Sequence, residues 1–434
     1  MMEHHLKVKK ATYHLYTFMI SKLISSFGAQ VYTFAISFYI LQLTGSATSF
    51  ATNLICSILP RTLLAPFAGA ITDRYSKKAI VISAQIATTI TIGGLLVYTF
   101  TSGLSLLAIY VTTSILSITS MFSGIAFTSS ITSLIDKERI QKAMSLNQMA
   151  ISFAAIGSPA IGGILYGAVT MPVFLVIYMI ASSIAVLLES TMNFKLFAKE
   201  KEVVEGAEKE SLLKSIKLGI DYLKLHPVIL LLLWMALLIN FFFGAFEVGY
   251  SYILIEKLQM KSQHFGFTQG AFSVGMVLMS IYFSIRKEVK FPFLVSKRGI
   301  IGLCFVMAAV AIPLLTSLSY NLIVGYYLVL MLTFGSLIMV INTPIQVMLQ
   351  KTIDEEYKGR VFSIIETMSM ALTPLGMVLY GVLYDLFPGQ WILMMSAGLL
   401  LCVVLFFARP SEIRKIHPEL GGGKETIREE VGAV

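Results

Sequence analysis

The chain has 434 residues, of which 56% are hydrophobic and only 13% are charged, and its mean hydropathy is +0.80. A soluble globular domain carries about 25% charged residues, so this composition excludes a protein whose main solvent is water. The net charge of +9 comes from basic residues scattered among short polar connections. Such scattering excludes the folded basic surface that a nucleic-acid partner requires.

Apolar segments follow one another along the whole chain, and their lengths lie close to or above the roughly 20 residues that a helix needs to cross a bilayer. They are too long for the tilted strands of a membrane barrel and lack apolar–polar alternation. We therefore predict an all-α integral membrane protein with twelve transmembrane helices. In chain order the predicted spans cover residues 13–43, 47–72, 79–100, 104–134, 143–169, 172–188, 227–255, 265–285, 299–316, 320–349, 361–387 and 391–408.

The basic residues between these spans fall on one side of the predicted membrane. The opposite connections hold only Lys257 and Lys261. By the positive-inside rule, the basic side is the cytoplasm, so both termini are expected there and the protein is expected in the plasma membrane. The basic side holds Lys7, Lys9, Lys10, Arg74, Lys77, Lys78, Lys137, Arg139, Lys142, Arg286, Lys287, Lys290, Lys297, Arg298, Lys351, Lys358 and Arg360, together with the long linker and the C-terminal tail.

One long polar stretch divides the chain into two halves of six spans each. It contains an apolar stripe at helical spacing, which predicts an amphipathic helix on the cytoplasmic membrane surface. The predicted organisation is a cytoplasmic tail, a six-helix bundle, a cytoplasmic linker with this helix, a second six-helix bundle and a cytoplasmic tail. These parts cover residues 1–12, 13–190, 191–226, 227–408 and 409–434.

Short matches indicate that the two halves are related. Leu41-Gln42-Leu43 recurs as Leu258-Gln259-Met260, and Ile135-Asp136-Lys137-Glu138 recurs as Ile353-Asp354-Glu355-Glu356. Both pairs are separated by nearly the same number of residues and lie at equivalent places in a six-plus-six plan. This pattern indicates a parallel duplication into two pseudo-symmetric bundles, which can rock about a central site and expose it to each side in turn.

Several chemistries lack their sequence motifs. No G-x-x-x-x-G-K-[ST] loop is present, and the nearest stretch, residues 421–426, fails this pattern, so we expect transport driven by a gradient rather than by ATP. The spans contain no H-E-x-x-H, no nucleophile elbow and no clustered His or Cys, so we expect neither an enzyme nor a bound cofactor or metal. Cys56, Cys304 and Cys402 lie inside predicted spans, without metal-ligand spacing.

Two motifs carry a family resemblance. The loop after the second span, with Gly69, Asp73, Arg74, Lys77 and Lys78, resembles the G-x-x-x-D-R-x-x-[KR]-[KR] signature of the major facilitator superfamily, which implies a role in conformational switching. In the fifth span, the stretch with Gly157, Pro159, Gly162 and Gly163 is similar to the G-P-x-x-G-G motif of the family's antiporters, with Ser158 where Gly is usual. We expect these residues to shape a helix bend and close helix contacts.

Further stretches resemble the macrolide-efflux and siderophore-exporter branch of that family, namely residues 23–28, 43–46, 219–222, 226–227 and 358–361. The resemblance implies an exporter of a small amphipathic molecule, such as a drug, a macrolide or a siderophore-like compound. It also implies alternating access with proton antiport, so the expected partners are the substrate, protons and membrane lipid, and we expect a monomer. Uptake, a lipid-like substrate and a non-transporting membrane sensor remain alternatives.

Four charged residues lie inside predicted spans: Lys22, Arg61, Glu247 and Glu366. Each costs about 2.5–3.5 kcal/mol or more at the bilayer centre, so a functional role is expected. The two acids are candidates for proton uptake or for binding a cationic group. The alternative is a structural charge pair, such as one between Arg61 and Glu366.

The repeat places two amides where the second half has acids, because Gln30 corresponds to Glu247 and Gln148 to Glu366. We group these two amides with Phe243, Phe246 and Tyr250 as candidate lining of a substrate cavity, since aromatic rings offer stacking faces to a bulky apolar molecule. Packing against lipid is the alternative explanation for the aromatic residues.

Overall fold

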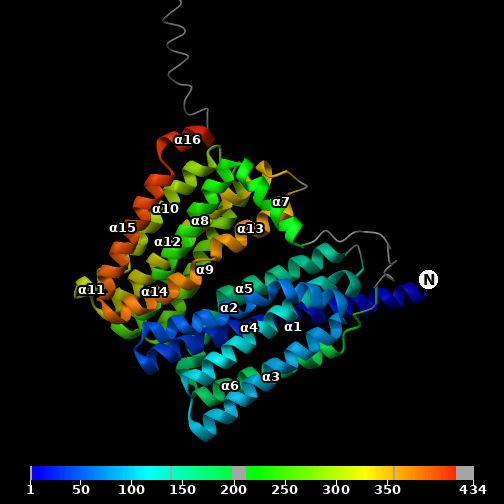
Figure 1. Ribbon diagram of the computed structural model, residues 1–434. Helices are drawn as coiled ribbons and strands as arrows, with labels where there is room; N and C mark the ends of the chain where they lie inside the picture. Colours follow the sequence, from blue (N-terminus) through cyan, green and yellow to red (C-terminus); the bar gives the residue numbers. More distant parts are fainter. Residues whose placement is uncertain (1, 137–138, 195, 198–211, 355–356, 417–434) are drawn as a thin grey trace, which may run out of the picture. The chain divides into compact units, whose positions relative to one another are not determined.

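The computed structural model describes residues 2–136, 139–194, 196–197, 212–354 and 357–416, and every regular element in these ranges is a helix (Figure 1). The elements are α1 (Met2–Thr44), α2 (Ala47–Arg74), α3 (Lys77–Ser102), α4 (Leu106–Leu134), α5 (Ile140–Ala168), α6 (Met171–Ser190), α7 (Leu212–Leu225), α8 (Pro227–Tyr252), η2 (Ile253–Lys257), α9 (Ser262–Ile285), α10 (Pro292–Ala309), α11 (Ile312–Leu315), α12 (Tyr320–Thr352), α13 (Lys358–Met370), α14 (Thr373–Leu386), α15 (Gly389–Phe407) and α16 (Pro410–Ile416).

Within the described ranges, 11 helical segments are long and apolar enough to cross a membrane. The 28-residue helix α2 supplies the twelfth. Three spans combine two elements, because α8 continues into η2, α10 into α11 and α13 into α14. The break before α14 coincides with Pro374 in its first turn, where the missing backbone N–H costs no helical hydrogen bond.

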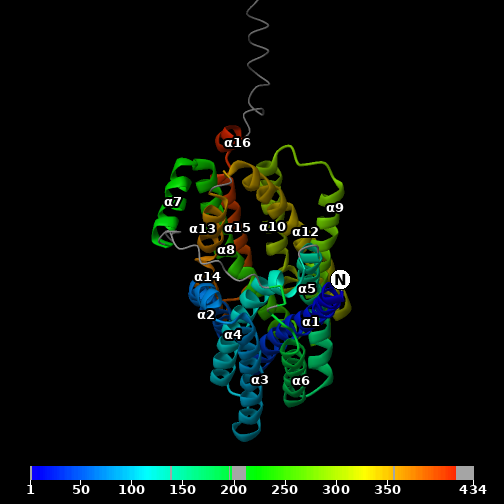
Figure 2. The same ribbon diagram turned by 90° about the vertical axis from the view of Figure 1, so that its right-hand side faces the viewer.

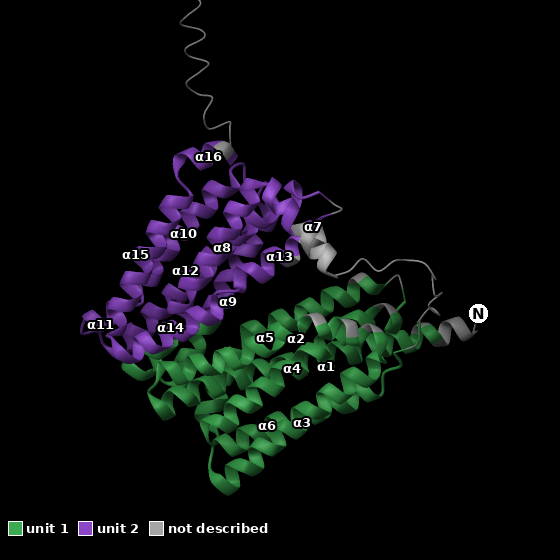
Figure 3. Ribbon diagram, in the orientation of Figure 1, with its two compact units in different colours: residues 1–205, 251–270 green, residues 206–250, 271–434 purple. Residues whose placement is uncertain are grey.

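The chain forms two compact units (Figure 3). Unit 1 contains residues 1–205 and 251–270, and unit 2 contains residues 206–250 and 271–434. Within unit 1, α3 packs against α4 and α6, while α1 packs against α5 and α6 (Figure 2). Within unit 2, α10 packs against α12 and α15. The pairs α10–α12 and α10–α15 repeat the pairs α3–α4 and α3–α6, as a parallel duplication requires.

Serine side chains cap the N-termini of three consecutive helices of unit 1. The hydroxyl oxygens of Ser46, Ser76 and Ser105 accept hydrogen bonds from backbone N–H groups in the first turns of α2, α3 and α4. These bonds satisfy donors that the helices themselves leave unpaired. Just before α2, Gly45 has a φ of 59°, a left-handed conformation that glycine adopts without steric cost.

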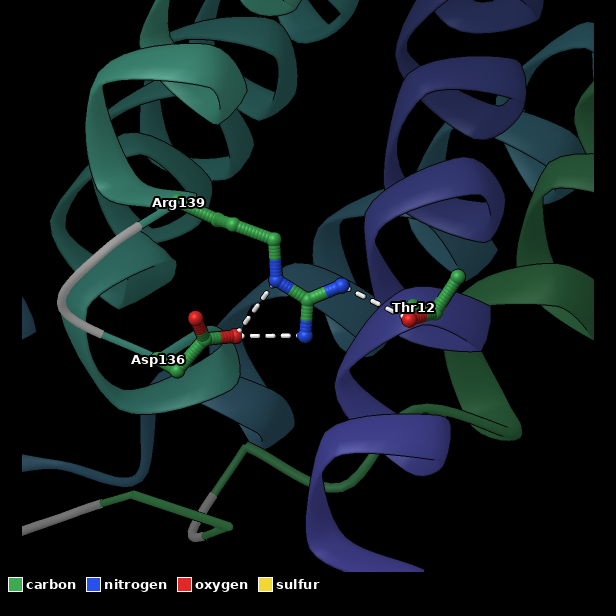
Figure 4. A network of polar contacts seen from close by, with 3 residues as sticks. All are labelled: Thr12, Asp136 and Arg139. Atoms are coloured by element: carbon green, nitrogen blue, oxygen red, sulfur yellow. Dashed lines mark hydrogen bonds and ion pairs between the residues drawn. The ribbon is translucent and has the colours of Figure 1, made fainter. Parts of the chain in front are cut away.

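The repeated Ile-Asp loops make equivalent contacts in the two halves. In unit 1, the Arg139 guanidinium lies within 2.7 Å of an Asp136 carboxylate oxygen and donates a hydrogen bond to the Thr12 hydroxyl of α1 at 2.6 Å (Figure 4). In unit 2, the Tyr222 hydroxyl of α7 donates to the Asp354 carboxylate at 3.2 Å. Each aspartate therefore helps to fasten its loop to the helix that leads into the first span of its half.

The linker helix α7 ends in the core of unit 2. Tyr222 and Leu223 are buried in one apolar cluster with residues of α8, α12 and α13, and the Tyr222 ring stacks on Tyr357 with centroids 4.8 Å apart. A helix covers Leu212–Leu225 of the predicted linker, and its last turn packs against protein; its place on the cytoplasmic membrane surface stays a prediction. Residues 198–211 of the predicted linker lie outside the described ranges.

An apolar cluster closes the end of unit 1 that carries the basic loops. Phe18 of α1 is fully buried and stacks on Phe127 of α4, with ring centroids 4.6 Å apart and an interplanar angle of 10°. Phe194, after α6, meets the edge of Phe127 at 6.3 Å. Three separate segments of the chain thus meet around one aromatic stack.

Phe18→Ala should lower the free energy of unfolding by about 3–5 kcal/mol, because it removes a fully buried ring and leaves a cavity. Thermal unfolding of the purified protein in detergent would measure the change. Leu63→Ala is the matched control, since the Leu63 side chain is 63% exposed. Equal unfolding temperatures for the two variants would show that the aromatic stack does not hold unit 1 together.

Candidate functional site

The first two residues of α3, Lys77 and Lys78, bind backbone carbonyl groups of α4 and of the end of α6. The Lys77 ammonium donates to the carbonyl oxygen of Ser129 in α4 at 2.6 Å. The Lys78 ammonium donates to the carbonyl oxygens of Ser190 and Met192, at the end of α6, at 2.8 and 2.9 Å. Ser190 and Met192 stand at the end of α6, where the last carbonyl groups lack helical partners and a cation is favoured, whereas the Ser129 carbonyl lies within α4. The two lysines of the motif therefore tie α3 to α4 and α6.

The other motif residues are placed as follows. Asp73 belongs to α2, but its side chain lies outside the described part of the structure. Arg74 is exposed at the end of the same helix. A Cβ added at Gly69 would meet no described atom within 4 Å. The role of this loop in conformational switching stays a prediction.

Unit 2 repeats the lysine contact. Lys297 of α10 donates to the carbonyl oxygen of Ala408, the residue that ends α15, at 2.6 Å. The number of residues from Lys78 to Lys297 is nearly the same as the number from Ser190 to Ala408. The repeated sequence stretches of the two halves are separated by nearly the same number of residues. The same interaction thus closes the same pair of helices in each half.

Lys78→Met and Lys297→Met should each destabilise the protein by about 1.5–3 kcal/mol, because each leaves helix-terminal carbonyl groups without a charged donor. Thermal unfolding in detergent would measure both variants. Lys287→Met is the control, since Lys287 is exposed in the connection between α9 and α10. If the three variants unfolded alike, the lysine contacts would contribute nothing to stability.

Glycine residues of α5 allow unusually close contacts within unit 1. A Cβ built on Gly163 would lie 2.3 Å from the carbonyl oxygen of Ser262, at the start of α9, and one built on Gly266 would lie 2.2 Å from the carbonyl oxygen of Pro159. The Ser262 hydroxyl donates to the Gly163 carbonyl oxygen at 2.9 Å. Backbone therefore meets backbone along this contact, with no room for a side chain.

The same helix contacts α1 through its other glycines. Cβ atoms on Gly157 and Gly162 would lie 3.1 Å from the Phe27 ring and 3.0 Å from the Phe34 ring. Pro159 lies inside α5, where it removes one helical hydrogen bond. The four motif residues of α5 thus lie at contacts with α1 and α9.

Gly163→Ala should destabilise the α5–α9 contact by about 1–3 kcal/mol, because the added methyl group requires backbone to shift. Gly94→Ala adds the same group to α3, where a Cβ meets no described atom within 4 Å. The unfolding temperature of Gly163→Ala should fall below that of Gly94→Ala. The reverse order would show that the contact tolerates a side chain.

The four predicted membrane charges differ in their surroundings. Lys22 is half-buried in α1 and interacts electrostatically with Glu189 of α6. Glu247 is half-buried in α8, whereas Arg61 of α2 and Glu366 of α13 are exposed. Arg61 belongs to unit 1 and Glu366 to unit 2, so a pair between them stays a prediction.

The aromatic residues around Glu247 pack within unit 2. Phe246 stacks on Phe334 of α12 with ring centroids 4.0 Å apart and on Tyr250 at 5.5 Å. Phe246 and Tyr250 are buried, and the ring of Phe243 lies 5.9 Å from that of Phe334. The segment that carries Glu247 is thus held by an aromatic stack between α8 and α12. A cavity-lining role for these rings stays a prediction.

The amides predicted to line a cavity lie in unit 1, where Gln30 is half-buried on α1 and Gln148 is exposed on α5. A separate cavity of about 660 Å³ lies within unit 1, near the C-terminal ends of α1 and α5. Its lining includes Tyr39, Gln42, Tyr166 and Gln263, and the Tyr166 hydroxyl donates to the Gln42 side-chain oxygen at 2.8 Å. None of the predicted lining residues borders this cavity.

Glu189 is a charged residue of a membrane helix that lies outside the predicted spans, because the predicted sixth span ends at residue 188. Helix α6 runs to Ser190, and Glu189 is only 2% exposed. Its position relative to Ser182 and Ala185 is the detectable signal, since spacings of three, four and seven residues place all three on one buried helix face.

The apolar spanning helices and the duplicated helix pairs define an integral membrane protein built from two related halves. The sequence profile described as "Major Facilitator Superfamily" matches residues 18–374. The chain belongs to this superfamily. Membership confirms the predicted fold of two six-helix bundles and makes the protein a multi-pass membrane transporter rather than an enzyme.

Among curated proteins, the chain is 22% identical over 403 residues to macrolide efflux protein A of Streptococcus pyogenes, covering 92% of this chain and 96% of that protein. It is 26% identical over 380 residues to the staphyloferrin A transporter of Staphylococcus aureus, covering 85% and 89%. The solved structure of the nucleoside transporter NupG superposes with a TM-score of 0.66 at 14% identity, covering 91% of this chain and 98% of that chain. The predicted resemblance to the macrolide-efflux and siderophore branch is confirmed at this level of similarity.

Proposed function

We propose that the protein exports a small amphipathic molecule from the cytoplasm by alternating access, in exchange for protons. Macrolide efflux protein A, a relative over most of the chain's length, supports export, and the staphyloferrin A transporter supports a small-molecule cargo. The positive-inside distribution supports cytoplasmic termini, which places the basic loops on the side from which an exporter takes its cargo. The protein acts in the cell membrane and, as we propose, as a monomer.

The observation that carries the proton-coupled mechanism is the position of Glu247. Glu247 is half-buried in a membrane-spanning helix and directly follows Phe246, whose ring stacks on Phe334. A carboxylate in such a place costs several kcal/mol unless it is neutralised or bound to a cation. Proton uptake or a cationic substrate group would each supply that neutralisation, so a substrate and a proton can compete for one acid.

Inverted membrane vesicles test the direction and the driving ion together. An exporter that exchanges its cargo for protons should accumulate a labelled macrolide or siderophore inside such vesicles when their lumen is made acidic. A protonophore should abolish this accumulation. Accumulation confined to right-side-out vesicles would establish uptake, and absence of flux for a broad panel of compounds in both preparations would favour a membrane sensor.

Glu247→Gln should reduce proton-driven accumulation by roughly 5- to 150-fold, the range of a coupling free energy between two sites. Exchange of labelled for unlabelled substrate, which moves no net proton, should persist. Glu366→Gln tests the second acid in the same way. Glu288→Gln is the control, because Glu288 is an exposed loop carboxylate paired with Lys351 at 2.6 Å. Equal loss of exchange and accumulation would assign Glu247 to folding or substrate binding instead of coupling.

A further inference from the structure

A buried carboxyl group joins α1 to α6 in unit 1. The Ser21 hydroxyl of α1 donates to one carboxylate oxygen of Glu189 at 2.7 Å. The second oxygen, Oε2, is fully enclosed and makes no hydrogen bond to any described atom. Because Glu189 is 2% exposed, water reaches neither oxygen in this conformation. One carboxylate oxygen therefore accepts a hydrogen bond, and the other accepts none from the described residues.

The cationic neighbour of Glu189 is the residue after Ser21. Lys22 interacts electrostatically with the carboxylate, yet no ion pair within 4 Å joins them among the described residues. The attraction thus offsets only part of the cost of burying the negative charge. A proton on Oε2 would remove that cost, and closer approach of Lys22 would reduce it. Either change would lower the free-energy cost of burying this carboxyl group.

Two other titratable residues, Lys78 and His14, make hydrogen bonds at the end of α6 near this site. Lys78 of α3 is engaged by the carbonyl groups of Ser190 and Met192. His14, two turns before Ser21 on α1, is 4% exposed, and the Asn193 N–H donates to its Nε2 at 3.4 Å. Its Nδ1 is also buried without a described partner. Two unsatisfied titratable atoms therefore flank the same end of α6.

This part of α1 also carries an apolar ring, one turn before Ser21, and a buried hydroxyl, that of Ser25, one turn after it. Phe18, one turn before Ser21 and Lys22 on α1, belongs to the apolar cluster that also contains Phe127, Met192 and Phe194. Such neighbours cannot solvate an anion, so a change in the charge of Glu189 must be answered by Ser21 and Lys22. Both residues belong to α1, so a change in the charge of Glu189 on α6 directly changes the interactions that hold α1.

We propose that Glu189 is a proton-binding site of unit 1, in which uptake of a proton at Oε2 removes the electrostatic attraction between Glu189 and Lys22 and so weakens the contact between α1 and α6. The step forms one O–H bond, with the proton supplied by water at the basic end of unit 1 when α1 and α6 separate. The carboxylate becomes neutral and nothing is oxidised or reduced. A contribution of this proton to transport rests on the proposed antiport; its binding does not.

Infrared difference spectra of the purified full-length protein, recorded between mildly acidic and mildly alkaline pH, test proton binding without any substrate. A protonated carboxyl has a C=O stretching band that a carboxylate lacks. The wild-type spectrum should contain a band that disappears in Glu189→Gln and persists in Glu288→Gln. If Glu189→Gln leaves every carboxyl band unchanged, Glu189 keeps one charge state throughout and the proposal is overturned.

Two milder variants keep the test decisive if Glu189→Gln does not fold. Ser21→Ala should retain the band but shift its frequency, because the hydrogen bond to the carboxyl oxygen is gone. Lys22→Met should make the band persist to more alkaline pH, since the cation that favours the carboxylate is removed. Absence of both shifts would contradict the assignment.

Flux measurements separate this proposal from the proposed function. If the band is present and assigned to Glu189 while proton-driven accumulation is absent, Glu189 binds a proton and the antiport proposal fails. If accumulation is proton-driven and the band is absent, antiport stands and Glu189 is a fixed charge. Only the presence of both, with accumulation reduced in Glu189→Gln, would connect this site to transport.

Discussion

The structure depends on one constraint, which is that the hydrocarbon core of a bilayer offers no hydrogen-bond partners. Every backbone N–H and carbonyl group in a span must find its partner inside the protein, so the spans are helices. Helix ends need additional partners, because four groups at each end lack helical ones. Ser46, Ser76 and Ser105 supply them at the beginnings of helices, and Lys78 and Lys297 supply them at the ends.

The same constraint gives meaning to the charged side chains. An acid inside a span is retained only where a proton, a cation or a hydrogen-bond donor lowers its cost. The two acids lie in different sequence surroundings: in unit 1, Glu189 has Ser21 and Lys22 from a neighbouring helix, and in unit 2, Glu247 follows Phe246 in an aromatic segment of α8. The duplicated scaffold thus carries unlike chemistry in its two halves.

Much of the scaffold could be predicted from the sequence because it follows from local properties. Span lengths, the polar linker and the related loops at Asp136 and Asp354 depend on residues close together in the chain. The lysine contacts at the ends of α6 and α15 could not be predicted, since they depend on which helices become neighbours. Glu189 lies outside the predicted spans for a local reason, because the predicted sixth span ends one residue before it.

The candidate site was less predictable than the fold, because side-chain direction decides it. The sequence places Phe246 and Tyr250 on a membrane helix, but their burial against Phe334 and Tyr327 depends on the pairing of α8 with α12. Similarly, the small residues of α5 predict a close helix contact without naming its partner. That partner, the first part of α9, belongs to the second half of the sequence.

This last feature has a consequence for biosynthesis. Domains fold as the chain leaves the ribosome, the N-terminal one first. The contact of Lys78 with the end of α6 can form once Met192 has been made, but unit 1 also includes residues 251–270. The part of α5 around Gly163 that contacts α9 therefore stays without this partner while the linker and α8 are synthesised. During that interval its small residues are open to any other helix in the translocon's vicinity, and the first half of the protein is complete only after the second has begun.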